Sequence, residues 1–309
     1  HYENKCCSAE AQADARRVAA KLKIPFYTVD AEKEFKKKVV DYFVKEYAAG
    51  RTPNPCVECN RFIKFGLLMD KTKSFGADFL ATGHYTRLKR TGLGSIKIFA
   101  ARDKLKDQSY FLYALTPDKL KRVIFPIGDY NKSEVRQMAK KMGLTVFKKR
   151  DSQEVCFINT DLYGFLGPRI KAKRGPIVAA NGKSLGMHNG LAYYTIGQRK
   201  GLNIGGTGPY YVVEKNFQNN ALVVADSDKN PLLYQKEMLV KNVNWVRPLP
   251  KNGRYQVKIR YSTRPVFAKI RRRKKEYLVI FDKPQKAVTP GQAAVFYLKN
   301  ELLGGGIII

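Results

Sequence analysis

The sequence changes character near Gly175, and this change most restricts the folds open to the chain. After that point, short runs rich in β-branched and aromatic residues alternate with turn signals. The turn signals are Asn181-Gly182, Asn189-Gly190, Gly205-Gly206 and Asn219-Asn220. The strand-like runs are Tyr210–Glu214, Ala221–Ala225, Tyr255–Tyr261, Pro265–Ile270, Tyr277–Phe281 and Ala294–Leu298. Regularly spaced turns between such runs are typical of small β-barrels or sandwiches, so we predict two β-rich units with a break at Pro231.

The part of the chain before Gly175 shows helical spacing instead. Residues 8–23 and 31–49 have the composition and apolar periodicity of helices, and a further helix extends to about Phe75. Two short apolar runs, Pro25–Asp30 and Asp78–Gly83, are predicted strands. This alternation predicts an α/β domain with an open, mostly parallel sheet covered by helices. Such sheets bind ligands beyond the carboxyl ends of their strands, which makes Gly83-His84-Tyr85 a candidate site.

The charge of the chain indicates a polyanionic partner. It carries 58 Lys and Arg against 26 Asp and Glu, a formal net charge of +32. Each phosphate neutralised by such a surface releases counterions and adds affinity, so nucleic acid is the favoured partner and an anionic membrane surface is the alternative. The basic runs are scattered along the chain, which favours a broad binding surface over a detachable tail. No apolar run approaches the roughly 20 residues of a membrane-spanning helix.

Five cysteines are an odd number for a chain of 309 residues. Cys6 and Cys7 are adjacent, Cys56 and Cys59 form a C-x-x-C pair, and Cys156 stands alone. This pattern is unlike the disulfide framework of a secreted protein. It suits a reducing cytoplasm and thiols that react or bind metal.

The C-x-x-C pair follows two prolines in the segment Arg51–Asn60, which we predict to be a stiff loop. Four interpretations of the pair are open: structural zinc, a redox pair, an iron–sulfur site with Cys156, or a pair that handles sulfur. Zinc needs four ligands, yet the sequence has three histidines and no second C-x-x-C. A redox pair would normally follow a strand and open a helix.

Two further features are weak signals in isolation. Lys106-Asp107-Gln108 places a cation, an anion and an amide together. The run Arg271–Lys275 is either the solvated face of a strand or a track for a phosphate backbone.

Taken together and in order, several motifs make the chain resemble the tRNA-specific 2-thiouridylases, a family that places sulfur on the wobble uridine of tRNA. The resemblance covers essentially the whole chain. The motifs are Gly50–Pro55 with Cys59-Asn60 and Ile63–Phe65, Ala81–Tyr85, Lys106–Leu112, Asp151–Gln153 with Cys156–Ile158, Gly197–Leu202, Thr289–Gln292 and Gly304–Gly306.

The resemblance implies three domains and a reaction. An ATP-pyrophosphatase-like α/β domain would span residues 1–165, a small β-rich central domain residues 166–235, and a C-terminal β-barrel that binds tRNA residues 236–309. The family uses ATP with Mg²⁺ to adenylate the uridine C2 oxygen, and a persulfide sulfur then displaces AMP. The implied partners are the anticodon stem and loop of tRNA and a sulfur-donor protein such as a cysteine desulfurase or a sulfur relay.

The resemblance also assigns roles to individual residues. Cys156 is similar to the family's persulfide carrier, and Cys59 to the nucleophile that forms a disulfide with it as sulfur leaves. Gly83 is similar to an ATP contact. The positions similar to target-base contacts are Asn54, Pro55 and Cys56. The positions similar to tRNA contacts are His84, Lys106, Asp107, Gln108, Arg260, Tyr261 and Gln292.

The sequence departs from the family pattern at two points. The family's phosphate-binding Ser-Gly-Gly-Val-Asp-Ser run does not occur in it, so we expect the upstream part to be missing and this chain alone to be inactive with ATP. Position 56 is often Asp in the family and is Cys56 here. Three cysteines, Cys56, Cys59 and Cys156, would also allow a [4Fe–4S] cluster with an open iron. The alternative function is therefore a basic tRNA-binding protein that has a structural metal or iron–sulfur site and no catalysis.

Overall fold

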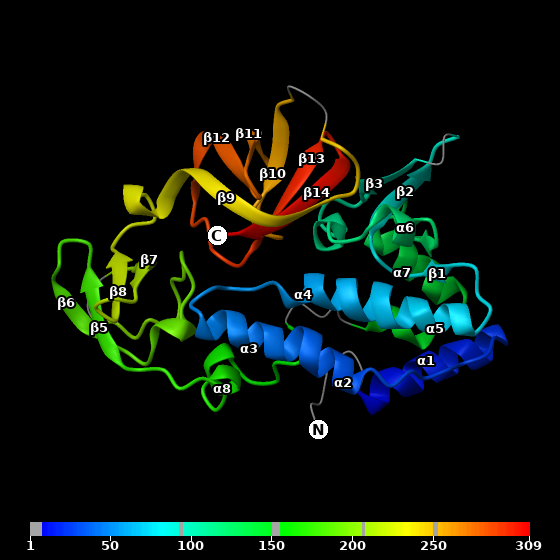
Figure 1. Cartoon of the computed structure of the whole chain (residues 1–309). Coiled ribbons are helices and arrows are strands. Elements are labelled where there is room, and N and C mark those ends of the chain that lie inside the picture. The colour runs from blue at the N-terminus through cyan, green and yellow to red at the C-terminus, as the bar shows by residue number, and fades with distance from the viewer. Residues whose placement is uncertain (1–7, 93–94, 150–154, 206–207, 250–252) are drawn as a thin grey trace. The chain divides into compact units, whose positions relative to one another are not determined.

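The computed structural model of the chain describes residues 8–92, 95–149, 155–205, 208–249 and 253–309 (Figure 1). Its internal contacts divide the chain into two compact units. The first unit holds residues 1–40, 55–165 and 300–302, and the second holds residues 41–54, 166–299 and 303–309. Several sequence features lie outside the described residues, namely Cys6, Cys7, Asp151–Glu154, Gly206 and the tip of the Gly92–Gly94 turn.

The first unit begins with two helical stretches, as predicted. Helix α1 starts after Ser8, whose hydroxyl accepts the N–H of Ala11, and ends at Lys23 in a left-handed conformation. A second stretch starts with α2 and continues as a π-helix, η1. The remaining helices are mostly short, and α7 begins with a capping box formed by Asn131 and Glu134. The bounds are α1 (Ala9–Leu22), α2 (Glu32–Phe35), η1 (Lys36–Val40), η3 (Ser109–Leu112), α6 (Pro117–Leu120), α7 (Lys132–Lys141), η4 (Thr145–Lys148) and α8 (Leu162–Leu166).

The proline segment, residues Arg51–Asn60, was predicted to be a loop, and this prediction was wrong in part. Instead of a loop reaching Asn60, a continuous helical run starts at Pro55 and consists of α4 (Pro55–Glu58), the π-helix η2 (Cys59–Leu67) and α5 (Leu68–Ser74). Proline is favoured in the first helical position because no intrahelical partner exists there for the N–H that it lacks. Cys56 and Cys59 therefore lie on a helix.

The predicted strand Pro25–Asp30 was wrong as well. Residues 24–31 belong to no strand or helix. A strand exists only where a neighbouring strand satisfies its N–H and carbonyl groups, and β-rich composition does not supply that neighbour.

The strands of the first unit form two small arrangements. β1 (Leu80–Ala81) pairs in parallel with β4 (Val123–Ile124), and β2 (Thr86–Arg90) pairs antiparallel with β3 (Ile96–Ala100). The first confirms the predicted strand at 78–83, and the second is an antiparallel hairpin. Buried side chains form the core around them, among them Val39, Phe65, Tyr110, Leu112 and Leu120.

The second unit contains one helix from the early part of the chain, α3 (Asp41–Ala48), and a central four-stranded sheet. The strand order of this sheet is β6-β5-β8-β7, with β5 and β8 parallel. Its core comprises Ile177, Leu191, Tyr194, Leu202, Val212, Leu222 and Val224. The bounds are β5 (Gly175–Ala179), β6 (Ser184–His188), η5 (Leu191–Tyr193), β7 (Tyr211–Asn216), β8 (Ala221–Ala225) and η6 (Pro231–Leu233).

The C-terminal strands of the second unit close into a six-stranded antiparallel barrel. The strand order is β13-β10-β11-β12-β9-β14, and β13 pairs with β14 to complete the circle. Closure leaves no unpaired edge, which a small all-β domain must otherwise protect. The bounds are β9 (Tyr234–Trp245), β10 (Tyr255–Lys258), β11 (Val266–Arg273), β12 (Glu276–Lys286), β13 (Ala293–Leu298) and β14 (Glu301–Ile308).

These observations confirm the predicted fold class, an α/β domain followed by a β-rich central part and a C-terminal barrel. Side chains that alternate between the inside and the outside of the barrel explain the pattern in the sequence. Tyr255 and Val257 are buried, for example, while Gln256 between them is not. Across the described residues, we find no helix of the length and hydropathy that crossing a membrane requires.

Candidate active site

Thr52, in the proline segment, has each of its three polar groups bonded within the second unit. Its N–H donates to the carbonyl of Pro290 at 2.9 Å, and its hydroxyl lies 3.0 Å from the hydroxyl of Thr195. Its carbonyl accepts the side-chain amide of Gln292 at 2.9 Å, and the same amide reaches the carbonyl of Pro53 at 3.3 Å. A segment held at every polar group has little freedom to move, so Asn54 leaves it in a defined direction.

Close packing adds to this attachment. Gly291 has a φ of +93°, and a Cβ on it would lie 2.8 Å from the nitrogen of Thr52. Position 291 therefore requires glycine for two reasons, namely its backbone conformation and the close approach of Thr52. Tyr47 is buried and bonded to Thr52 and Thr195, and its burial raises its pKa to about 12. It stays a neutral hydroxyl in this network at all physiological pH values.

Cys56 and Cys59 occupy the first turns of the helical run that begins at Pro55. The Cys56 side chain is exposed, and that of Cys59 is partly buried. Residues three apart face the same side of a helix, so both thiols share one side. Asn60 follows and is buried; its amide donates to the carbonyl of Phe111 at 3.2 Å, which ties the start of η2 to η3.

Cys156 lies in a turn that aromatic packing holds. The ring of its neighbour Phe157 is buried and contacts Phe35 of α2 at 5.8 Å and Phe165 of α8 at 5.4 Å between centroids. Helix α2 also contacts η2, the element that begins at Cys59. Cys59 begins η2 and Cys156 precedes Phe157, so the elements that carry these two thiols both contact α2. Cys156 is partly buried, like Cys59.

The three cysteines do not fit an iron–sulfur cluster as they stand. Within the described ranges, no three His, Cys, Asp or Glu side chains gather closely enough to hold a metal ion. A [4Fe–4S] cluster on three cysteines requires such a group.

The structure brings together two of the motifs that are distant in sequence. The Gln108 side chain accepts the N–H of Tyr85 at 2.9 Å, and the Gln108 N–H donates to the carbonyl of Tyr85 at 2.8 Å. This reciprocal pair joins the segment 106–108 to the end of the β1 region, next to Gly83 and His84.

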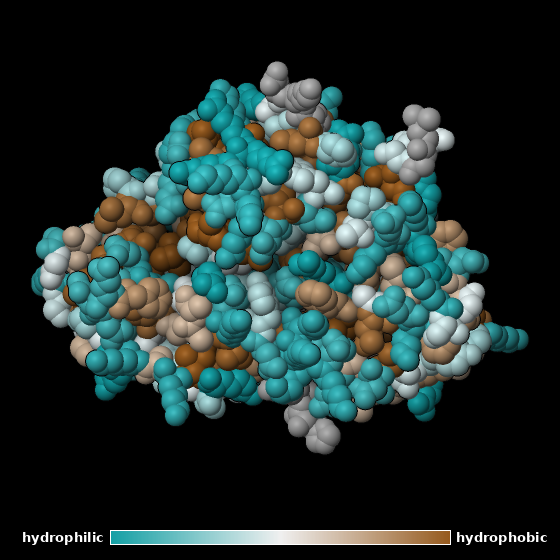
Figure 2. Space-filling model, viewed as in Figure 1, coloured by the Kyte–Doolittle hydropathy of each residue, from teal (hydrophilic) through white to brown (hydrophobic). Residues whose placement is uncertain are grey.

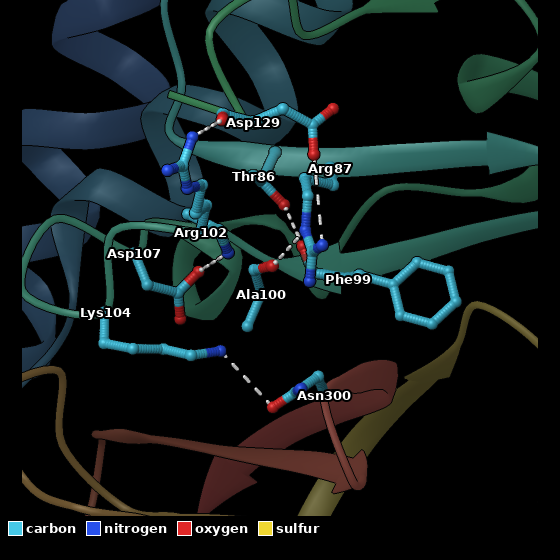
Figure 3. Close-up of polar contacts among 10 residues, drawn as sticks. Thr86, Arg87, Phe99, Ala100, Arg102, Lys104, Asp107, Asp129 and Asn300 are labelled. Atoms are coloured by element: carbon cyan, nitrogen blue, oxygen red, sulfur yellow. Dashed lines mark hydrogen bonds and ion pairs between the residues drawn. The ribbon is translucent and has the colours of Figure 1, made fainter. Parts of the chain in front are cut away.

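Asp107 shapes the turn that contains it. Its carboxylate accepts the N–H of Ala101 at 2.9 Å (Figure 3). It also accepts the N–H of Ser109 at 3.2 Å. The Ser109 hydroxyl donates to its second oxygen at 3.0 Å. Nearby, the amine of Lys104 points toward Asn300, 3.4 Å from the side-chain oxygen. Asp107 therefore has a structural role, because both of its carboxylate oxygens accept hydrogen bonds that stabilise this turn.

His84 is buried and uncharged. Its Nδ1 lies 2.8 Å from the Thr82 hydroxyl, and its ring packs between Phe65 and Phe125. Burial, with a smaller contribution from the charge of Lys64, lowers the pKa of His84 from 6.5 to about 3. A contact with RNA through this residue would therefore use a neutral imidazole and no positive charge.

The lowered pKa predicts how stability depends on pH. Because the folded state binds the His84 proton more weakly than the unfolded state, stability should fall as pH drops below about 6.5. This residue should cost about 2 kcal/mol of unfolding free energy between pH 7 and pH 5. We expect urea unfolding of His84→Asn to lack that part of the pH slope, and the wild-type imidazole NMR signal to stay fixed from pH 8 to pH 5. An imidazole that titrates near pH 6.5 would contradict this account.

Arg260, Tyr261 and Gln292 all lie in the second unit, with different surroundings. One guanidinium nitrogen of Arg260 donates to the carbonyls of Ile196 and Ala287, at 2.8 and 3.1 Å, and to the Thr289 hydroxyl at 2.6 Å. Arg260 thus joins the central part to the barrel. Tyr261 is 38% exposed and has the amine of Lys258 5.2 Å from its ring centroid.

The chain is similar both to known family domains and to individual proteins. Residues 1–160 match the family domain described as a tRNA methyl transferase HUP domain, residues 163–226 its PRC-barrel domain, and residues 235–308 an aminomethyltransferase β-barrel domain. The tRNA-specific 2-thiouridylase MnmA of Carboxydothermus hydrogenoformans is 44% identical over 98% of this chain and 84% of its own length. The chain belongs to the tRNA-specific 2-thiouridylase family. The MnmA proteins of Bacillus pumilus and Clostridioides difficile are 45% and 44% identical, over 99% of this chain and 84% and 86% of their own lengths.

Viewed as a 2-thiouridylase, the chain contains site residues that the sequence did not point to. Tyr47 and Thr195 hold the proline segment through hydroxyl groups, and no motif distinguishes them from ordinary residues of a helix and a turn. The contact of Gln292 with that segment joins residues 240 positions apart in sequence. Only a three-dimensional structure could reveal either relation.

Proposed function

We propose that this 2-thiouridylase catalyses ATP-dependent 2-thiolation of the wobble uridine of tRNA. The observation that carries the proposal is the identity of 44–45% over 98–99% of the chain with enzymes named for that reaction. The net charge of +32 supports an RNA substrate, because a surface of this sign attracts the phosphate backbone.

The chemistry requires that the C2 oxygen of uracil become a leaving group. We propose that the oxygen attacks the α-phosphate of ATP and releases pyrophosphate, and that Mg²⁺ accompanies the phosphates as part of this substrate. The backbone at Gly83 is the proposed ATP contact, beyond the end of β1, where ligands bind in sheets of this class.

Sulfur transfer then uses two thiols. The terminal sulfur of a persulfide on Cys156 attacks C2, and AMP leaves with the oxygen. The Cys59 thiolate next attacks the Sγ of Cys156, so the bond between the two sulfurs of the persulfide breaks and 2-thiouridine is released. A disulfide between Cys59 and Cys156 remains, and a dithiol reductant must return two electrons before the next cycle. No step runs through an iron–sulfur cluster.

The base must leave the anticodon stack to reach these thiols. Unpaired loop bases can be extruded at a cost of a few kcal/mol or less. Asn54, Pro55 and Cys56 are the proposed base contacts. Thr52 and Pro53, which precede Asn54, are held by hydrogen bonds, and these bonds fix the backbone that leads into Asn54.

The remaining site residues are proposed to contact other parts of the tRNA or to hold the residues of the site in position. His84, Lys106, Asp107, Gln108 and Tyr261 remain proposed RNA contacts, with His84 neutral and Asp107 acting through the turn that it shapes. Arg260 is proposed to support the site through its internal bonds as well as contact RNA. Gln292 is proposed to act through its hydrogen bonds to the carbonyls of Thr52 and Pro53. A sulfur-donor protein would load Cys156, and the reaction would occur in the cytoplasm, where both tRNA and reduced thiols are present.

The proposal is tested by the stoichiometry of the reaction. The full-length protein produced from the gene that encodes this chain is incubated with unmodified tRNA, ATP, a cysteine desulfurase with free cysteine as the persulfide donor, and a dithiol reductant. Thiolated tRNA is resolved on a mercury-containing gel. We expect one AMP and one pyrophosphate per sulfur incorporated. If tRNA binds tightly but neither AMP nor thiolated product forms, the protein is a tRNA-binding module without catalysis.

A further inference from the structure

The basic run Arg271–Lys275 has no part in the site described above. It lies on the barrel, where β11 ends, a two-residue turn follows and β12 begins. All five side chains of the run are exposed. Over residues 266–281, which make up this hairpin, the chain has six Lys and Arg and one acidic residue, Glu276. The hairpin thus has a local charge of +5, and it rests on a rigid closed barrel.

The alternation of β11 arranges these charges in a row. Phe267, Lys269, Arg271 and Arg273 are exposed, whereas Ala268 between them is fully buried. Side chains two residues apart on a strand are about 7 Å apart on the same face. Each of the three cations in the row can therefore meet a separate phosphate of a nucleic acid strand.

The row has few acidic neighbours. Its cross-strand partners on β12 are Ile280, Leu278 and Glu276, opposite Lys269, Arg271 and Arg273 respectively. Among the described residues, we find no carboxylate paired with any of these three cations. Arg272 donates only to the carbonyl of Lys274. A charge row without internal partners keeps its attraction for an external anion.

The neighbouring strand extends this surface with aromatic rings. Gln256 of β10 lies opposite Phe267, so Arg254 and Lys258, two residues to either side, face the same way. The Arg254 guanidinium stacks 4.4 Å from the Phe267 ring centroid while pairing with Asp282, and Lys258 lies over Tyr261. Hydrophilic side chains gather in the part of the view where Figure 1 places β11 and β12 (Figure 2). Cations interleaved with exposed aromatic rings are typical of RNA-binding surfaces.

We propose that this outer face, from Lys258 and Tyr261 along β11 to the turn at Lys274, is a docking surface for the phosphate backbone of tRNA. The proposal rests on the proposed function and extends it, because the surface reaches about 24 Å along β11 away from Tyr261. Its contacts are electrostatic and independent of base sequence, so it adds affinity without selecting the anticodon.

A substitution at Lys274 can change the charge of the surface without destabilising the hairpin. Its φ of 54° lies in the left-handed region, which Asn tolerates better than Lys. Lys274→Asn should therefore leave the hairpin as stable or more stable while it removes one cation. Arg271→Gln/Arg273→Gln removes two more from the exposed face. Lys183→Gln/Lys229→Gln is the matched control, since both lysines are exposed in other turns of the second unit.

The experiment measures tRNA affinity as a function of salt for these proteins, with circular dichroism to verify folding. We expect the slope of log K against log salt to shrink by about 1 for Lys274→Asn and about 2 for the double variant, with no change for the control. In thiolation assays, KM for tRNA should rise about tenfold for the double variant while kcat is unchanged.

Two results would overturn the inference. One is an unchanged slope and KM in both hairpin variants. The other is a loss of binding to vesicles containing phosphatidylserine with tRNA binding intact, which would make the surface a membrane contact. If the wild-type protein binds tRNA through this surface but never thiolates it, the proposed function fails and the docking surface stands.

Discussion

Replacing Cys156 or Cys59 by serine should reduce thiolation of tRNA on the order of 10³-fold or more. A serine hydroxyl cannot carry a persulfide, and at position 59 it cannot release the sulfur by thiol exchange. The two variants should fail at different steps. Cys156→Ser should take up no sulfur from the donor. Cys59→Ser should accumulate sulfur or tRNA covalently attached to Cys156, which mass spectrometry of the protein would detect.

Cys56→Ser provides the matched control, because Cys56 begins the same helical run and is more exposed than Cys59. A base contact tolerates the exchange of a thiol for a hydroxyl, so we expect less than about a tenfold loss. Release of pyrophosphate should persist in all three variants, since adenylation precedes the use of either thiol. If Cys56→Ser is as inactive as the other two, the two-thiol scheme is wrong and a site that needs three sulfurs replaces it.

Replacing Gln292 by methionine should lower kcat on the order of 10²-fold and change tRNA affinity by less than twofold. The substitution keeps the size of the side chain and removes the two hydrogen bonds to the carbonyls of Thr52 and Pro53. Those bonds hold the backbone immediately before Asn54, a proposed base contact. A displacement of about 1 Å in a positioning group can cost 10²-fold in rate.

The network around Thr52 offers a second way to test the same idea. Thr195→Val removes the hydroxyl that meets Thr52 at 3.0 Å, and Thr195→Ser retains it. We expect kcat to fall in the valine variant and to recover in the serine variant, with tRNA affinity constant in both. Gln285→Met is the control for Gln292, since the Gln285 amide bonds only to the carbonyls of Lys283 and Pro284 in its own strand, β12. If Gln292→Met instead weakens tRNA binding with kcat unchanged, Gln292 acts as an RNA contact and not through the segment.

Much of the architecture could be predicted from local patterns. Alternation in the barrel strands, the cap at Ser8 and the capping box at Asn131 depend on residues close together in the chain. The errors arose where a local preference met a wider context. The two prolines predict a loop that includes position 55, but Pro55 is the first residue of a helix. Pro25–Asp30 had the composition of a strand and found no partner.

The candidate site divides in the same way. Cys59 and Cys156 could be singled out because reactive thiols are few and their motifs are specific. The attachment of Thr52 could not, because Pro290 and Gln292 approach it from the far end of the chain. The neutral state of His84 was also hidden, since its pKa depends on burial between Phe65 and Phe125.

The most direct test of the central claim is the modification state of a single nucleotide. The full-length gene that encodes this chain is expressed in a bacterium that lacks its own tRNA 2-thiouridylase, and the tRNAs are analysed by position-resolved mass spectrometry. The account predicts 2-thiouridine at the wobble position, and its absence when Cys156 is replaced by serine. Wobble uridines that remain unthiolated although the wild-type protein is expressed and bound to tRNA would contradict it.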